Sequence, residues 1–216
     1  MSRHAYRTAA AMLLALAVLP ANAQQSRAGG GLPPRDEWQK VPEILAALGA
    51  APGRRIADIA AGKGYLTKPL AEKVGKTGHV YAVEIGEEEL SALRALSKQE
   101  GLTNVDVIVG SESDPHLPNN LDGAVILNSY HELTDYKTTL AAINRALKPG
   151  GLLVLVDNAA MGGWFTERND QASHHALNPK YVDAELRAAG FEIVERRDDF
   201  IVEPYAQWLI VARPAT

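Results

Sequence analysis

Residues 58–67, with the sequence DIAAGKGYLT, constrain the fold more than any other part of the chain. An apolar run over residues 55–59 ends in the carboxylate of Asp58, and Gly62 and Gly64 follow at alternate positions. Beyond Gly64 the apolar residues take helical spacing. Glycines between a strand and a helix let the backbone approach a ligand, and the helix offers it unpaired N–H groups. The stretch therefore predicts a ligand-binding turn.

A second carboxylate, Glu84, ends the next predicted strand, residues 80–84. It follows Asp58 at close to the roughly 20-residue spacing at which an acidic side chain binds the hydroxyl groups of a ribose. A dinucleotide motif would place a third glycine where this chain has Thr67. An acid directly before the turn would also repel a pyrophosphate, whereas it suits a cationic amine or sulfonium. The pattern favours an adenosine ligand that carries positive charge.

Strands and helices alternate along most of the chain, which predicts an α/β fold with a mostly parallel sheet and helices on both faces. The last two strands have no helix between them, so we expect them to pair antiparallel. The predicted strands are residues 55–59, 80–84, 105–109, 123–127, 152–157, 191–197 and 207–213, and the predicted helices are residues 35–48, 67–74, 87–100, 134–147 and 179–189.

The turn resembles motif I of the class I S-adenosylmethionine-dependent methyltransferases, usually written D-x-G-x-G-x-G. The matching residues are Asp58, Ala60, Gly62 and Gly64, with Ala60 in the place of the first glycine. The LKPGG sequence at residues 147–151 is similar to a turn of the same family. The resemblance implies a three-layer Rossmann-like fold, a seven-stranded sheet in the order 3-2-1-4-5-7-6 with an antiparallel last strand, and S-adenosylmethionine as cofactor.

The resemblance also implies roles for the cofactor-binding residues. Asp58 and the glycine turn would flank the methionine end of the cofactor, and Glu84 would bind both ribose hydroxyls. The family usually holds the adenine amine with Asp or Asn just after the third strand, where this chain has Ser111 and Glu112. A solvated loop with a turn before Pro115 is the alternative for this segment.

The fourth predicted strand leads into Asn128 and His131, and this stretch resembles the N-x-x-H of some small-molecule methyltransferases. Asn128 would face both cofactor and substrate. His131 is the candidate general base, because histidine titrates in the useful range, and Asn128 is the candidate orienting amide. A pair formed by His131 and Glu132 that only bonds a helix N-terminus is the alternative.

We expect no metal ligands, and specifically no structural zinc site. The chain has no cysteine. His174 and His175 are adjacent, and adjacent histidines point in different directions and seldom bind one metal together. The loop that carries them is expected to lie over the substrate pocket.

The N-terminus has the three parts of a signal peptide: two arginines, an apolar run and an A-x-A site ending at Ala23. The run is too short for a stable membrane span, so we expect cleavage after Ala23 and a periplasmic or secreted protein. Residues 24–34 then form a flexible linker and residues 35–216 the methyltransferase domain. Cleavage removes Arg3 and Arg7 and no acid, so the formal charge moves from −4 to −6, which argues against nucleic acid as a partner.

The sequence thus predicts an S-adenosylmethionine-dependent methyltransferase acting on an unidentified small-molecule methyl acceptor. Two alternatives stay open. One is an exported binding protein of methyltransferase fold without turnover, because the cofactor is made in the cytoplasm. The other is an NAD-dependent oxidoreductase, which Thr67 and the final antiparallel strands disfavour. The pattern leaves the oligomeric state open.

Export can be tested by sequencing the N-terminus of the protein recovered from a fractionated bacterial host. We expect the mature chain to begin at Gln24 and to be found outside the cytoplasm. An intact Met1 in the cytosolic fraction would refute export and would also remove the question of how the cofactor reaches the protein.

Overall fold

The computed structural model describes residues 33–160 and 167–215, which belong to one compact unit. The predicted signal peptide, residues 1–23, and the predicted linker up to residue 32 lie outside the described residues. No helix in the described ranges is long and apolar enough to cross a membrane.

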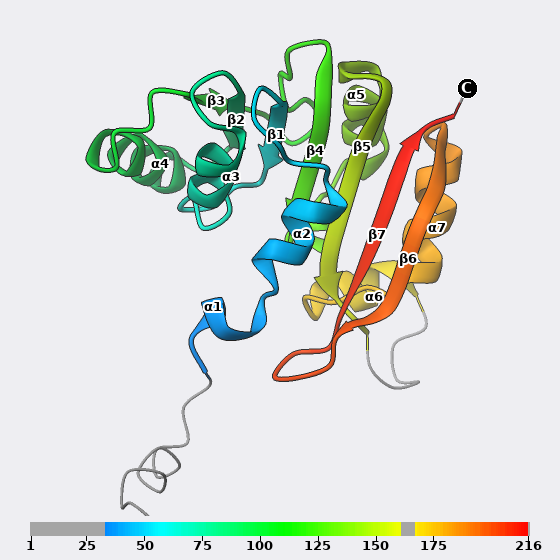
Figure 1. Ribbon diagram of the computed structural model, residues 1–216. Coiled ribbons are helices and arrows are strands. Elements are labelled where there is room, and N and C mark those ends of the chain that lie inside the picture. The colour runs from blue at the N-terminus through cyan, green and yellow to red at the C-terminus, as the bar shows by residue number, and fades with distance from the viewer. Residues whose placement is uncertain (1–32, 161–166, 216) are drawn as a thin grey trace, which may run out of the picture. The chain divides into compact units, whose positions relative to one another are not determined.

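Seven strands form one sheet in the order β3-β2-β1-β4-β5-β7-β6, which confirms the predicted topology (Figure 1). The first five strands of the chain pair in parallel, and β7 runs antiparallel to both β5 and β6. The strands are β1 (Arg55–Ile59), β2 (His79–Glu84), β3 (Val105–Val109), β4 (Leu121–Leu127), β5 (Leu147–Asn158), β6 (Phe191–Ile201) and β7 (Gln207–Pro214).

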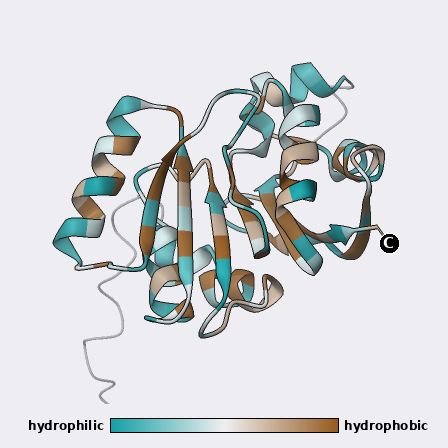
Figure 2. Ribbon diagram, turned by 90° about the horizontal axis from the view of Figure 1, so that it is seen from above, coloured by the Kyte–Doolittle hydropathy of each residue, from teal (hydrophilic) through white to brown (hydrophobic). Residues whose placement is uncertain are grey.

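Helices cover both faces because successive side chains of the central strands point to opposite sides. In β4, Val125 packs with α2 (Val41–Ala47) and α3 (Thr67–Val74), whereas its neighbours Ala124 and Ile126 pack with α5 (Tyr136–Ala146) and α7 (Pro179–Ala188). Figure 1 shows α2 in front of the sheet and α5 behind it. Apolar residues line the strands between these helices (Figure 2).

The predicted helix over residues 35–48 is two helices, α1 (Arg35–Trp38) and α2, separated at Gln39 and Lys40. Pro42 explains the break, because it has no N–H for the carbonyl of Trp38 and its ring would clash with that carbonyl in a continuous helix. Lys40 turns the chain with a φ of 52°. The bend leaves the side chains of Arg35 and Gln39 buried or half-buried near the sheet.

Two further differences from prediction lie near the C-terminal half. β5 begins at Leu147, where we expected the helix to end, and its pairing with β4 shifts register before Gly123. A short helix, α6 (Arg168–Ser173), occupies part of the segment predicted as a loop. α4 (Glu87–Gln99) follows β2 as predicted, within one residue at its end. None of these differences moves the carboxyl ends of β1, β2 and β4, where the site lies.

Candidate functional site

The turn after β1 is shaped by three residues in the left-handed region of backbone space. Ala60, Gly62 and Gly64 have φ values of 54°, 57° and 90°. Gly64 is also needed for space, since a Cβ there would lie 2.4 Å from a methyl carbon of Leu96 on α4. Ala60 takes a conformation that costs an L-residue energy, and such strain concentrates at functional sites.

Asp58 is the next-to-last residue of β1, and its side chain is almost wholly buried. Its carboxylate accepts a hydrogen bond of 2.7 Å from the hydroxyl of Thr67, the first residue of α3. Burial raises the pKa of Asp58 to about 7, and the charge of Glu84 raises it further, while the Thr67 hydrogen bond and the charge of Arg35 act in the opposite direction. A cation placed beside this carboxylate would favour its ionised form.

Glu84 is held in place by two backbone groups. One carboxylate oxygen accepts the N–H of Gly62 at 2.7 Å, and the other accepts the N–H of Ile85 at 2.9 Å. A carboxylate has about four lone-pair positions, so about two stay open for further donors. Glu84 thereby links the end of β2 to the glycine turn and can still accept hydrogen bonds from a ligand.

Two hollows share Ala60 and are therefore neighbours. The polar hollow is lined by charged side chains of both signs, Arg35 and Lys63 on one hand and Asp58 on the other. Its other lining residues include Ala61, Gly62, Tyr65, Leu66, Leu127, Asn128 and Ser129. The lining of the apolar hollow contains three glutamates, Glu84, Glu112 and Glu132. Its other residues include Ile59, Val83, Ile85, Ser111, Pro115, Leu133, Thr134 and Thr139. A flat base fits the second lining, and an amino-acid group with both charges fits the first.

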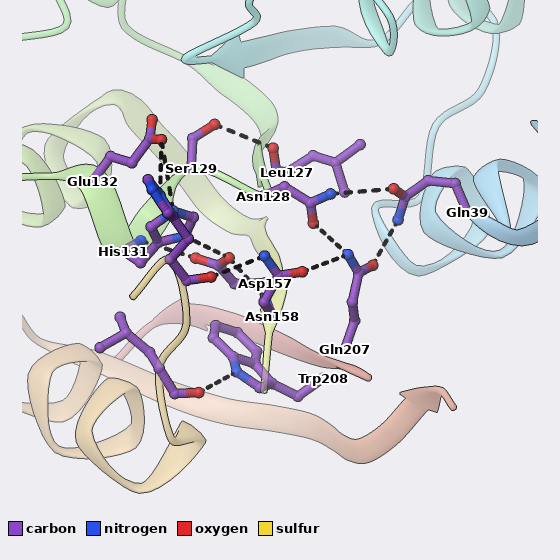
Figure 3. A network of polar contacts seen from close by, with 12 residues as sticks. Gln39, Leu127, Asn128, Ser129, His131, Glu132, Asp157, Asn158, Gln207 and Trp208 are labelled. Atoms are coloured by element: carbon purple, nitrogen blue, oxygen red, sulfur yellow. Dashed lines mark hydrogen bonds and ion pairs between the residues drawn. The ribbon is translucent and has the colours of Figure 1, made fainter. Parts of the chain in front are cut away.

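His131 lies in the short 3-10 turn η2 (Tyr130–Glu132) after β4, with its side chain 3% exposed. Its Nδ1 is 2.8 Å from a carboxylate oxygen of Asp157, the buried residue near the end of β5, and its backbone N–H donates to the other oxygen at 2.8 Å (Figure 3). Burial lowers the pKa of His131, but the hydrogen bond and charge of Asp157 outweigh it and raise the pKa overall. Its Nε2 faces Nδ1 of His175 at 3.3 Å.

Asn128 belongs to a network of buried amides (Figure 3). Its side chain accepts from Gln207 at 2.9 Å and donates to Gln39 at 3.3 Å, and Gln39 in turn donates to Gln207 at 2.8 Å. Its φ of 57° turns the backbone beside the polar hollow. The side chain of Asn128 thus bonds to residues of β7 and of the α1–α2 break, and the residue that orients His131 is Asp157.

Comparison with known proteins identifies the domain. Residues 56–151 match the family model described as a methyltransferase domain. A methyltransferase from Aquifex aeolicus, titled SAM-dependent, superposes with a TM-score of 0.72 at 24% identity, over 83% of this chain and 92% of that one. The chain therefore has the class I methyltransferase fold, and residues 56–151 carry the methyltransferase-domain match. Two further structures share this fold. The [4+2]-cyclase SpnF superposes with a TM-score of 0.71 at 16% identity, over 82% of this chain and 81% of that one. The glycopeptide N-methyltransferase MtfA, in complex with sinefungin, superposes with a TM-score of 0.66 at 18% identity, over 87% of this chain and 89% of that one.

Curated relatives of the methyltransferase domain are quinone-biosynthesis enzymes. The ubiquinone/menaquinone biosynthesis C-methyltransferase UbiE of Hydrogenovibrio crunogenus is 36% identical over 122 residues, which is 56% of this chain and 47% of that protein. The demethylmenaquinone methyltransferase of Geobacillus stearothermophilus is 30% identical over 124 residues, 57% of this chain and 52% of that protein. The chain spans about half the length of these relatives.

The structure brings most of the predicted cofactor residues together around the two hollows, whereas Gly64 lines neither of them. Ser111 and Glu112 both line the apolar hollow. The expected turn before Pro115 is also present, because the backbone N–H of Asp114 donates to the hydroxyl of Ser111 at 3.0 Å. His131 and Asn128 lie on the adjoining end of β4, and His131 lines neither hollow.

Sequence reasoning missed Arg35, Tyr65 and Asp157. The guanidinium of Arg35 lies 4.0 Å from the centre of the Tyr65 ring, and both line the polar hollow. A break in the first helix brings Arg35 there, and nothing local to Arg35 signals it. Asp157 could have been suspected, because an acid ending an apolar strand occurs at Asp58 and Glu84 too.

The raised pKa of Asp58 predicts how stability changes with pH. Between about pH 4 and 7 the folded protein keeps a proton that the unfolded chain has lost, so the wild type loses stability as pH rises through this window. Asp58→Asn should lack this loss and should gain up to about 1.4 kcal/mol per pH unit relative to wild type. Urea unfolding at pH 4.5, 6 and 8 measures the difference, and parallel curves for the two proteins would contradict it.

Proposed function

We propose that this protein is an S-adenosylmethionine-dependent methyltransferase that acts on a small molecule. The observation that carries the proposal is the junction of the two hollows at Ala60. One hollow offers a buried carboxylate and a guanidinium, and the other offers apolar walls with Glu84 at its edge. This combination matches an adenosine joined to a charged amino acid.

Each part of the cofactor has a suitable partner among these residues. Asp58, once ionised, attracts the ammonium and sulfonium charges, and Arg35 attracts the carboxylate. Glu84 would accept from the two ribose hydroxyls with its open lone pairs, and Ser111 and Glu112, which line the same hollow, are the proposed partners of the adenine amine. The bound cofactor supplies an electrophilic methyl group, and the protein supplies alignment and shelter from water.

His131 is the proposed general base on the acceptor side. The buried carboxylate of Asp157 accepts from Nδ1–H, which fixes the ring and leaves the lone pair of Nε2 to take a proton. Quinone precursors are the first acceptors to test, because the relatives described above are methyltransferases of ubiquinone and menaquinone biosynthesis. Because the match covers about half of those proteins, we propose a quinone-like small molecule as the class of acceptor and name no individual compound.

A binding protein without turnover is the second candidate. The [4+2]-cyclase SpnF supports this alternative, because it has the same fold and its name gives a reaction other than methyl transfer. Export after cleavage at Ala23, which we also propose, would separate the protein from the cytoplasmic source of the cofactor. Calorimetry with S-adenosylmethionine, S-adenosylhomocysteine and NAD, followed by mass spectrometry of quinol acceptors, separates an enzyme, a binder and an oxidoreductase.

Replacing Glu84 tests the cofactor site. Glu84→Ala should weaken S-adenosylmethionine binding by roughly 2–4 kcal/mol, because it removes two charge-assisted hydrogen bonds and loosens the N–H of Gly62. Glu88→Ala is the matched control, since Glu88 is an exposed acid that pairs with Lys63 beside the same turn. Calorimetry of both folded variants decides the assignment, and equal affinity in Glu84→Ala and wild type would refute it.

Replacing His131 separates catalysis from binding. His131→Gln can still donate to Asp157, so the fold should persist, and cofactor affinity should stay within about twofold of wild type. Methyl transfer should fall by about 100- to 10,000-fold, the usual contribution of a placed base. Turnover and calorimetric affinity are measured on the same sample once an acceptor is found. Wild-type turnover in this variant would leave His131 with a structural role only.

A further inference from the structure

Three potential metal ligands converge beside the proposed active site. His131 and Glu132 come from η2, and His175 follows α6. His131 Nε2 lies 3.3 Å from His175 Nδ1 and 3.6 Å from a carboxylate oxygen of Glu132, and the same oxygen lies 3.8 Å from His175 Nδ1. Two imidazoles and one carboxylate, called here the His–Glu–His cluster, therefore bring three potential ligand atoms within 4.8 Å of one another.

These separations are those of atoms around a small cation. Zinc binds nitrogen and oxygen at about 2.0–2.2 Å in a tetrahedron, which places neighbouring ligand atoms roughly 3.3–3.5 Å apart. The cluster needs movements of only a few tenths of an ångström to reach that geometry. A simple hydrogen bond between the two histidines explains the shortest distance but leaves Glu132 beyond hydrogen-bond reach of both rings.

Both histidines are anchored from behind. Asp157 binds Nδ1 of His131, the carboxylate–histidine arrangement that orients metal ligands in proteins, and so directs Nε2 into the cluster. Asn158 donates from its side chain to the backbone carbonyl of His175 at 2.9 Å. His175 has a φ of 54°, so its place is set by strained backbone. Neighbouring residues of β5 thus hold the ring of His131 and the backbone of His175 in position.

Charge and exposure also suit a cation. Two neutral imidazoles with the carboxylates of Glu132 and Asp157 carry about two negative charges, which a divalent ion would balance. The side chains of His175 and Glu132 are 75% and 58% exposed, whereas that of His131 is 3% exposed. The cluster is therefore closed on the side of β5 and open towards solvent, as in sites where a metal keeps a position for water or substrate.

We propose that His131, Glu132 and His175 bind one divalent transition-metal cation of the zinc type. The proposal replaces the expectation of no metal, which rested on the absence of cysteine and on the adjacency of His174 and His175. The two do diverge as expected: Nδ1 of His174 lies 2.8 Å from the carbonyl oxygen of Asp170, and His175 turns to His131 instead. The histidine that joins His175 in the cluster is therefore His131, 44 positions away in the sequence, and not its neighbour His174.

The cation would stand beside the apolar hollow proposed for the adenine, which Glu132 lines, and would bind His131, the proposed general base. An acceptor with an oxygen donor could occupy its open position. Metal binding and the general-base role use the same lone pair of His131 Nε2, so the cation-loaded protein would use this nitrogen as a ligand and the cation-free protein would use it as a base.

The test is a calorimetric titration of Zn²⁺ into the untagged full chain after removal of metals with a chelator, with neither cofactor nor acceptor present. We expect one Zn²⁺ per chain. His175→Ala and Glu132→Gln should each weaken binding by at least tenfold, and both change exposed side chains that the fold does not need. His174→Ala is the matched control and should stay within twofold of wild type. Circular dichroism confirms that each variant is folded.

Absence of Zn²⁺ binding by the wild type up to 100 µM would overturn the proposal, as would unchanged binding in His175→Ala. An equal loss in His174→Ala and His175→Ala would assign binding to an unspecific histidine surface and would overturn it as well. Because the titration contains no S-adenosylmethionine, its outcome is independent of the cofactor-binding test at Glu84.

Discussion

The reversal of strand order between β1 and β4 is the constraint on which the site depends. β2 and β3 extend the sheet on one side of β1, and β4 and β5 extend it on the other. The chain therefore leaves the ends of β1 and β4 in opposite directions and opens a crevice between them. Asp58, Glu84, Asn128 and Asp157 all lie at the carboxyl ends of strands around this crevice. Parallel pairing, set by apolar strands buried on both faces, is what gathers these polar groups from distant parts of the sequence.

Two of those groups are buried carboxylates that the protein treats differently. Asp157 accepts three hydrogen bonds, from the backbone and ring of His131 and from the backbone of Asn158. Asp58 receives one, from Thr67, and its pKa is raised to about 7 by burial. The first carboxylate is satisfied and positions a neighbour. Asp58 has fewer hydrogen-bond donors, so its ionised form is costly in the buried site, and a cationic ligand would lower that cost.

The fold and the cofactor side could be predicted because their signals are local. Glycines beside a strand end mark the turn, an acid ends the next strand, and the absence of a helix before β7 marks its antiparallel pairing. Arg35, Gln207 and His175 could not be predicted in the same way. Arg35 depends on a helix break caused by Pro42, and Gln207 meets Asn128 across 79 positions of sequence. His175 meets His131 across 44 positions through a segment that the sequence showed only as a loop.

The backbone itself supports the division into a cofactor side and an acceptor side. Ala60, Asn128 and His175 are not glycines, yet each has a positive φ, of 54°, 57° and 54°. Ala60 joins the two hollows, Asn128 borders the polar one, and His175 completes the His–Glu–His cluster. Strain of this kind persists only where the surroundings fix it. At Asn128 the fixing groups are Gln39 and Gln207, and at His175 the side chain of Asn158 bonds to the backbone carbonyl. Gln207 also donates to Asn158 at 3.0 Å, so one amide network holds the cofactor side and the acceptor side in a common frame.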